Sequence, residues 1–184
     1  HIWLGGEESS KDGTIFNANI PTEEVFSAPQ YNGVNGVVHS TKPLIYHGNT
    51  ISDFSFTFKD GKIVEYTAKE GYEVLKELVE TDEGSHYLGE VALVDHFSPI
   101  SQSNQIFYET LFDENASCHL AIGASYPTCL KNSDGLSEEE LKERGLNHSL
   151  THVDFMIGHE RMNIKGYTRD GQAVDIMIDG RLQV

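Results

Sequence analysis

The sequence predicts an α+β fold, in which a few short helices accompany a mostly antiparallel sheet that could curve toward a barrel. Three observations favour this class. Stretches of alternating apolar and polar residues, which are typical of half-buried strands, recur along the chain. Turn sequences such as Lys59-Asp60-Gly61-Lys62 favour antiparallel hairpins. Helical spacing is confined to short segments, and no internal boundary is apparent, so we expect a single domain over residues 1–184.

The expected elements follow from local patterns. Residues 1–33 are rich in Gly, Asn and Ser and should form loops with short strands, with 21–26 as a helical turn or a structured loop. From 34 to 68 the pattern is that of strands, and Phe54, Phe56 and Phe58 define one buried face. The later elements are a helix at 69–81, a strand at 90–97, a helix at 105–112, a strand at 119–124, a helix after the Ser137–Glu140 capping box, and strands at 152–157, 162–168 and 173–178.

The charge of the chain excludes some classes of partner. Its 184 residues include 13 Lys and Arg and 29 Asp and Glu, which gives a formal net charge of −16. Nucleic acid and anionic membrane surfaces are therefore unfavourable partners. No apolar stretch approaches the ~18–20 residues of a membrane-spanning helix. Because the chain starts at His1 and shows no secretory signal, we expect a cytoplasmic segment of a longer protein, with Cys118 and Cys129 as reduced thiols.

The clearest candidate site is the segment His152-Val153-Asp154. Side chains at positions i and i+2 of a strand point to the same face, so this imidazole and this carboxylate would stand side by side. The residues that follow are apolar, and an unpaired carboxylate buried among them would be costly. Two interpretations stay open at this point: a metal site, or a buried His–Asp hydrogen bond.

Further carboxylates and a second histidine lie at the boundaries of predicted elements. Two acids, including Glu114, fall within seven residues of chain that end at His119, at a helix-to-strand junction that could also be a simple polar cap. Glu90 stands at the start of an apolar strand, where it is either functional or paired in a salt bridge. Glu23 and Glu24 form a weaker candidate, because most such pairs are solvated.

Together these residues indicate a metal site. Carboxylate and imidazole ligands suit Zn²⁺, Co²⁺ or Mn²⁺, and four carboxylates with two imidazoles are too many for one tetrahedral zinc. They suit two ions about 3.5–4 Å apart that share a carboxylate and activate water for hydrolysis. The chain contains no GxSxG motif, no phosphate-binding loop and no GxGxxG motif after a strand.

Six segments taken together resemble one family, the aminopeptidase T, aminopeptidase S and PepS group of co-catalytic metallo-aminopeptidases. They run in order through nearly the whole chain: Asn19–Pro29, Thr41–Leu44, Gly89–Val94, Leu111–Gly123, Gly145–Ser149 and His152–Gly158. The resemblance implies an enzyme that uses two divalent ions, zinc or cobalt, to release N-terminal amino acids from peptide substrates. It also implies that the chain is the C-terminal, metal-bearing domain of a longer protein that is commonly a homodimer.

The resemblance further implies the residues of the site. The metal ligands of the family fall on Glu24, Glu90, Glu114, His119, His152 and Asp154, and its catalytic tyrosine falls on Tyr126.

The resulting hypothesis assigns a role to each group. Glu90 bridges the two ions, Tyr126 donates a hydrogen bond to the developing oxyanion, and either Glu24 or Glu114 acts as general base. Two alternatives stay open. The chain could be a non-catalytic domain that serves as a scaffold or dimerisation unit. It could also be a mononuclear iron enzyme, with both candidate histidines and Asp154 as a facial triad.

Overall fold

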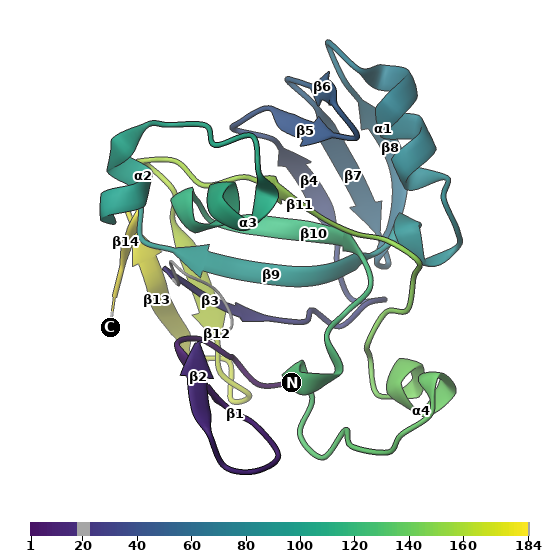
Figure 1. Ribbon diagram of the computed structural model, residues 1–184, viewed down its shortest axis with the longest axis vertical. Coiled ribbons are helices and arrows are strands. Elements are labelled where there is room, and N and C mark those ends of the chain that lie inside the picture. Colours follow the sequence, from purple (N-terminus) through teal and green to yellow (C-terminus); the bar gives the residue numbers. More distant parts are fainter. Residues whose placement is uncertain (18–22, 184) are drawn as a thin grey trace.

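A four-stranded antiparallel sheet forms the centre of the computed structural model, which describes residues 1–17 and 23–183. The strand order is β11-β10-β9-β3, and β9, β10 and β11 run across the middle of the molecule in Figure 1. The strands are β3 (Glu24–Ser27), β9 (Leu88–Val94), β10 (His119–Gly123) and β11 (His152–Met156). The two inner strands, β9 and β10, are almost completely buried, so they give the sheet a rigid centre.

A second antiparallel sheet, of order β4-β7-β8, packs against the central sheet through aromatic side chains. Its strands are β4 (Gly36–His39), β7 (Ser55–Lys59) and β8 (Lys62–Thr67). The predicted face of Phe54, Phe56 and Phe58 is buried, and the Phe56 ring lies 5.1 Å from the ring of Phe155 in β11. Helix α1 (Tyr72–Val79) adds its buried leucines to this core, so two sheets and a helix share one hydrophobic cluster.

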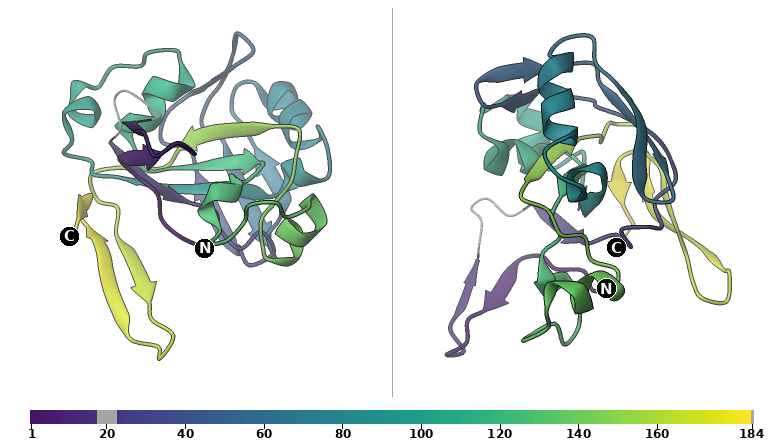
Figure 2. Two further views of the ribbon diagram at one scale, coloured as in Figure 1. Left: turned by 60° about the horizontal axis from the view of Figure 1, so that its bottom comes forward. Right: turned by 90° about the vertical axis from the view of Figure 1, so that its right-hand side faces the viewer.

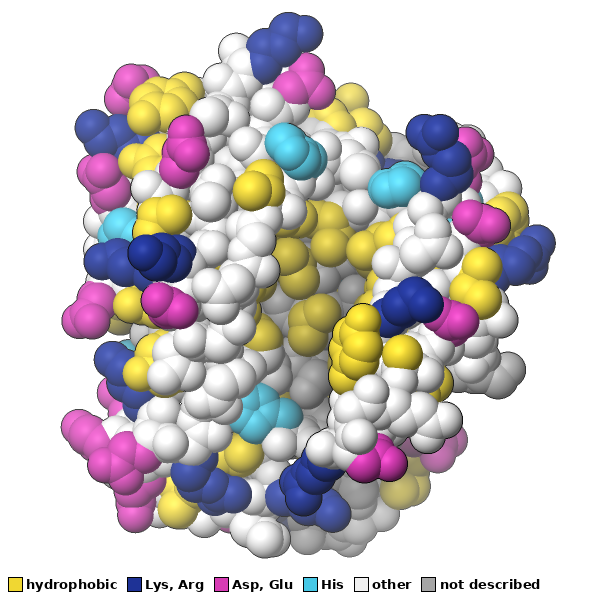
Figure 3. Space-filling model, turned by 180° about the vertical axis from the view of Figure 1, so that it is seen from behind, with side chains coloured by type: hydrophobic (Ala, Val, Ile, Leu, Met, Phe, Trp, Pro, Cys, Tyr) yellow, Lys and Arg dark blue, Asp and Glu magenta, His cyan; other side chains and the backbone are white. Residues whose placement is uncertain are grey.

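The remaining elements surround this centre. The other strands are β1 (Glu7–Ser9), β2 (Ile15–Asn17), β5 (Leu44–Tyr46), β6 (Asn49–Ile51), β12 (Ile164–Tyr167), β13 (Ala173–Ile178) and β14 (Arg181–Leu182). The other helical segments are α2 (Pro99–Ser103), α3 (Thr110–Asp113), α4 (Glu138–Glu143), η1 (Gly84–His86), η2 (Glu114–Ala116) and η3 (Pro127–Cys129). The β12–β13 hairpin projects from the body (Figure 2), and the surface seen from behind has a hollow lined with hydrophobic side chains (Figure 3).

The fold confirms the expected combination of antiparallel sheets and short helices, but the sheet does not close into a barrel. In the described part of the chain, the outer strands β3 and β11 do not pair with each other. Four short strands are too few to bring these edges together. Each edge instead makes isolated contacts: Leu4 pairs with Phe26 in β3, and the Thr41 amide donates to the Met156 carbonyl in β11.

Two local predictions are wrong. The helix expected at 105–112 is replaced by α2 and α3, and between them Asn104 and Tyr108 have φ values of 52° and 60°, which a right-handed helix does not contain. Glu24, Val25 and Phe26, expected in a helical turn or a structured loop, belong to β3 because they pair with β9. The rest of that segment, up to residue 22, lies outside the described residues.

Other local predictions are confirmed. The helix expected at 69–81 is α1, and the capping box of Ser137 and Glu140 starts α4. Cys118 and Cys129 are free and buried thiols. Within the ranges that the structure describes, no helix combines the length and the apolar character needed to cross a membrane.

Candidate metal centre

Five of the six predicted ligands stand on one face of the central sheet, and the strand register explains why. In antiparallel pairs, directly opposed residues point to the same face. Ala121 in β10 is opposite both Glu90 in β9 and Asp154 in β11. His119 and His152 lie two residues from these positions along their own strands, so their side chains share that face. Glu24 joins them from β3, because it is opposite Val94, which lies an even number of residues after Glu90.

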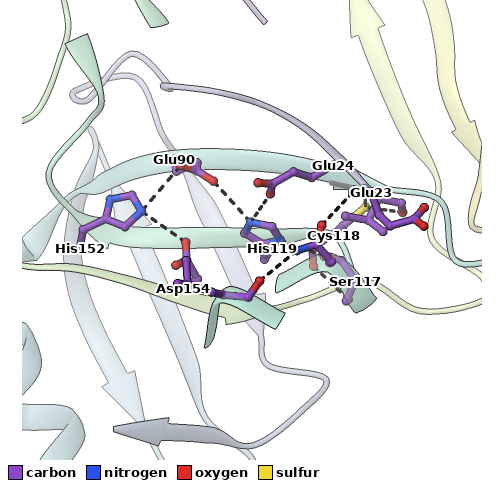
Figure 4. A network of polar contacts seen from close by, with 11 residues as sticks. Glu23, Glu24, Glu90, Ser117, Cys118, His119, His152 and Asp154 are labelled. Carbon is purple, nitrogen blue, oxygen red and sulfur yellow. Dashed lines mark hydrogen bonds and ion pairs between the residues drawn. The ribbon is translucent and has the colours of Figure 1, made fainter. Parts of the chain in front are cut away.

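His119 is the most buried of these side chains, with no exposed surface. Its Nδ1 atom lies 2.9 Å from the Ser117 carbonyl oxygen, which can only accept, so Nδ1 carries a proton and donates it. In the neutral ring this leaves a lone pair on Nε2. That atom lies 3.0 Å from Oε2 of Glu24 and 3.4 Å from Oε1 of Glu90 (Figure 4). The carbonyl therefore fixes the tautomer that a metal ligand needs.

His152 is held in the same way on the other side of Glu90. Its Nδ1 atom donates to the Ala124 carbonyl at 2.7 Å, and its Nε2 atom lies 3.5 Å from Oδ1 of Asp154 and 3.7 Å from Oε2 of Glu90. The two oxygens of Glu90 thus face different histidines, Oε1 toward His119 and Oε2 toward His152 (Figure 4). Glu90 occupies the position that a carboxylate shared by two ions would take.

The sixth predicted ligand, Glu114, comes from η2, just before β10, and is also buried. Its carboxylate lies within 4.8 Å of ligand atoms of His119 and Asp154. Two further groups of three meet the same limit: Glu24, Glu90 and His119, and Glu90, His152 and Asp154. All six predicted ligands are therefore brought together. Among the described residues, each of these groups contains only one histidine.

Three buried atoms of the cluster lack hydrogen bonds within the described part of the chain: Oε2 of Glu24, Nε2 of His119 and Oδ1 of Asp154. Oε2 and Nε2 are only 3.0 Å apart, but their orientation is not that of a hydrogen bond. Buried polar atoms without partners are costly and rare. Nitrogen and oxygen atoms that converge without hydrogen bonds among them are what a cation can coordinate once it has displaced their protons. These groups therefore fit a site for divalent metal ions.

The electrostatics of the cluster lead to the same conclusion. Burial, reinforced by Asp154 and Glu24, raises the pKa of Glu114 to about 8. Burial also raises the pKa of Glu90. For the histidines burial acts in the opposite direction, but neighbouring carboxylates outweigh it: the pKa of His119 is well above its ordinary value, and that of His152 is about 9. Without a cation the cluster retains protons, and divalent ions would replace them.

A cavity of about 900 Å³ opens onto the cluster and is lined by five of the predicted ligands and by Tyr126. The Tyr126 ring lies 4.9 Å from the ring of His152 and is about half exposed. Burial, with Glu90 and Asp154 as the next causes, raises the pKa of the phenol to about 12, so the hydroxyl keeps its proton. Sequence reasoning missed the other walls of the cavity, which include Tyr46, His47 and Tyr108. The His47-Gly48 turn was the only local signal there.

Fold and site together define a metalloprotein domain, and comparison with known proteins places it in a family. The family model described as thermophilic metalloprotease (M29) matches residues 1–182. The chain belongs to this family.

Similar proteins carry aminopeptidase names. Aminopeptidase 2 of Geobacillus stearothermophilus is 58% identical over 180 residues, and aminopeptidase T of Thermus thermophilus is 44% identical over 181 residues. Each match covers 98% of this chain and 44% of the relative, so the chain spans less than half the length of these curated relatives. The solved structure of wild-type AmpT from Thermus thermophilus superposes with a TM-score of 0.92 at 43% identity, covering 100% of this chain and 45% of AmpT.

Proposed function

We propose that this chain is the metal-binding catalytic domain of an aminopeptidase that hydrolyses the first peptide bond of peptides with a free N-terminus. The observation that carries the proposal is the position of Glu90, whose two carboxylate oxygens face the Nε2 atoms of two different histidines. The names of the relatives support the reaction class. The single domain described here would work as part of a longer cytoplasmic protein and as a homodimer.

The cluster divides naturally into two ligand sets that share Glu90. One set is Glu24, Glu90 and His119, and the other is Glu90, His152 and Asp154. Glu114 lies near His119 and Asp154 and would complete the coordination. Oxygen and nitrogen donors suit Zn²⁺, Co²⁺ or Mn²⁺. When bound, two such ions would polarise the scissile carbonyl and lower the pKa of the attacking water.

Side chains of this chain would stabilise the oxyanion and transfer the proton. Tyr126 keeps its proton and lines the cavity above the cluster, so its hydroxyl can donate a hydrogen bond to the oxyanion that develops on the substrate carbonyl. A carboxylate that is not shared, Glu24 or Glu114, would accept the proton of the attacking water and pass it to the leaving amine.

The geometry argues against a mononuclear iron site. A facial triad requires two histidines and one carboxylate around a single ion. No group of three ligand atoms within 4.8 Å in the described part of the chain contains both His119 and His152. A single-ion site would also leave most of the carboxylates in the cluster buried without a cation.

The test is a cobalt titration of the metal-free protein, followed by visible absorbance and by hydrolysis of an aminoacyl 4-nitroanilide. We expect saturation at two ions per chain for the unsubstituted protein. Glu90→Gln should lose this stoichiometry, whereas Glu83→Gln, on an exposed residue, should keep it. Saturation at one ion by the unsubstituted protein, or at two by Glu90→Gln, would contradict the shared carboxylate.

A second variant tests the proposed role of Tyr126. Tyr126→Phe should lower kcat by about 10²–10³ while both ions stay bound, because only the hydrogen bond to the oxyanion is lost. An unchanged kcat would exclude that role.

A further inference from the structure

Two segments line the cavity beyond the ligand cluster and have no part in holding ions. The first is the β5–β6 hairpin, which contributes Ile45, Tyr46 and His47. The second lies between α2 and α3 and contributes Tyr108. A smaller cavity is lined by both Ile45 and Tyr108, and by Asp154 of the ligand cluster. The two segments therefore lie close together, directly beside the cluster.

The hairpin presents a flat aromatic surface to the cavity. Its two-residue turn has positive φ at both central positions, 47° at His47 and 76° at Gly48, as a type I′ turn requires. Asn or Gly usually occupies the first of these positions, but His is also among the residue types enriched at positive φ. The His47 ring stacks on the Tyr46 ring, with centroids 4.0 Å apart and an angle of 19° between the planes. The turn places two stacked rings at the rim of the cavity.

Tyr108 combines an unfavourable backbone conformation with an exposed ring. Its φ is 60°, and its side chain is 72% exposed although it is large and mostly apolar. The neighbouring residues hold the segment in place, since the Phe107 amide donates to Oδ1 of Asp113 at 2.8 Å and the Phe107 ring packs edge-on against Phe112. Left-handed backbone at a bulky residue persists only when the surroundings impose it, and it is concentrated at functional sites.

We propose that Tyr108 and the stacked Tyr46–His47 pair form the subsite that holds the side chain of the substrate's first residue. This inference rests on the aminopeptidase activity proposed above and names the part of the same cavity that would select substrates. A free N-terminal residue bound at the ligand cluster has its own side chain next to the scissile carbonyl. The same cavity is also lined by the aliphatic Ile45, Leu111 and Val153 and by the polar Glu109 and Thr110.

The lining favours large apolar side chains. Within the described residues, no Lys or Arg lines this cavity, and Glu109 adds a carboxylate to the lining, which disfavours an acidic first residue. Each apolar group of the substrate that aromatic and aliphatic walls remove from water makes the free energy of binding more favourable. The enzyme should therefore bind the transition state of a phenylalanyl substrate more tightly than that of an alanyl substrate. The difference should depend on the rings at the rim.

The test compares kcat/KM for phenylalanyl and alanyl 4-nitroanilides in the full-length, cobalt-loaded enzyme. We expect Tyr108→Ala to lower the ratio of the two values by about tenfold, the scale of a lost apolar contact in a substrate pocket. Tyr108→Phe should retain the ratio, because the ring face and not the hydroxyl makes the contact. Tyr167→Ala is the matched control: Tyr167 is 73% exposed in the projecting β12–β13 hairpin, and both the ratio and the activity should stay unchanged.

The outcomes separate this subsite from the function on which it rests. If the unsubstituted enzyme binds two ions but hydrolyses neither substrate, the aminopeptidase activity fails and the subsite fails with it. If the enzyme is active and Tyr108→Ala leaves the ratio within twofold, the subsite alone is overturned. A cobalt titration of each variant checks that the metal centre is intact, since Tyr108 is not a ligand.

Discussion

The side chain of Asn147 connects the fold to the metal centre, and its removal should be costly. Asn147 is 5% exposed, and its Nδ2 group donates to the carbonyls of Gly84 at 2.8 Å and Gly123 at 2.6 Å. Both of these carbonyls belong to buried residues. Asn147→Ala removes the side-chain donor of both carbonyls, although the Gly84 carbonyl still accepts from the Tyr87 amide at 3.0 Å. At about 1–3 kcal/mol for a buried acceptor left unsatisfied, here the Gly123 carbonyl, plus the weaker loss at Gly84, we expect a loss of roughly 2–3 kcal/mol in unfolding free energy.

The measurement is urea unfolding of Asn147→Ala beside a matched control, Asn163→Ala. Asn163 also makes two side-chain hydrogen bonds, donating to the Arg161 carbonyl and accepting from the Asp179 amide, both at 3.1 Å, but it is exposed. Because water replaces lost bonds at the surface, the control should change stability by no more than about 0.5 kcal/mol. Equal losses in the two variants would refute the reasoning, because burial would then have no effect on the value of the bonds.

The same variant should weaken metal binding. Gly123 has a φ of 106°, and a Cβ atom there would lie 2.1 Å from the Thr151 carbonyl oxygen, so this turn is tightly constrained. The next carbonyl, that of Ala124, accepts the proton from Nδ1 of His152. When the Asn147 amide no longer holds this turn, the acceptor that fixes the His152 tautomer is free to shift. Cobalt affinity should therefore fall in Asn147→Ala and stay unchanged in Asn163→Ala.

Three further predictions concern pH and the core. Cobalt affinity should rise between about pH 6 and pH 9, because bound ions displace protons from Glu114, with a pKa of about 8, and His152, with a pKa of about 9. Cobalt titrations at a series of pH values measure this affinity, and an affinity that does not change with pH would contradict the prediction. Burial alone would raise the pKa of Asp82, but hydrogen bonds from two backbone amides and a serine hydroxyl outweigh it and lower the pKa. Its stabilisation is present above the unfolded pKa of about 3.9 and disappears as pH falls through the lower folded value, so the stability difference between wild type and Asp82→Asn should shrink in acid unfolding curves. Phe56→Ala, at a core residue that is 1% exposed, should lose about 3–5 kcal/mol in urea unfolding, whereas Val64→Ala, at a residue that is 56% exposed, should change it by no more than about 0.5 kcal/mol.

The sequence predicted the elements whose pattern is local. Alternation around Phe56 fixed a buried strand face, and the Ser137 capping box fixed the start of α4. The prediction of a helix at 105–112 was wrong because its apolar residues are not buried. Ile106, Phe107 and Tyr108 are exposed, and Tyr108 has a left-handed backbone conformation. The apolar composition of this segment predicted burial, but in the folded chain these side chains are exposed.

The choice between Glu23 and Glu24 shows what local pattern could not decide. The two acids are adjacent, and nothing nearby in the sequence distinguishes them. The choice depends on pairing with a strand more than sixty residues away: Glu24 is opposite Val94 and so shares a face with the other predicted ligands. The amide of Glu23, in contrast, donates to the side chain of Asn115, outside the cluster. Only the resemblance to a family could make this assignment from sequence.

The space for ions depends on two small residues, Ala121 and Ala92. Ala121 has no exposed surface and stands between Glu90 and Asp154, opposite both, while Ala92 in β9 stands opposite His119. A larger side chain at either position would point into the face where the ligand atoms converge. Because the alanine methyl groups are small, they leave space on this face of the sheet, where the longer carboxylate and imidazole side chains face one another. Candidate ligands can therefore be proposed from a sequence through resemblance, whereas the volume that they enclose depends on strand register, which only the folded chain determines.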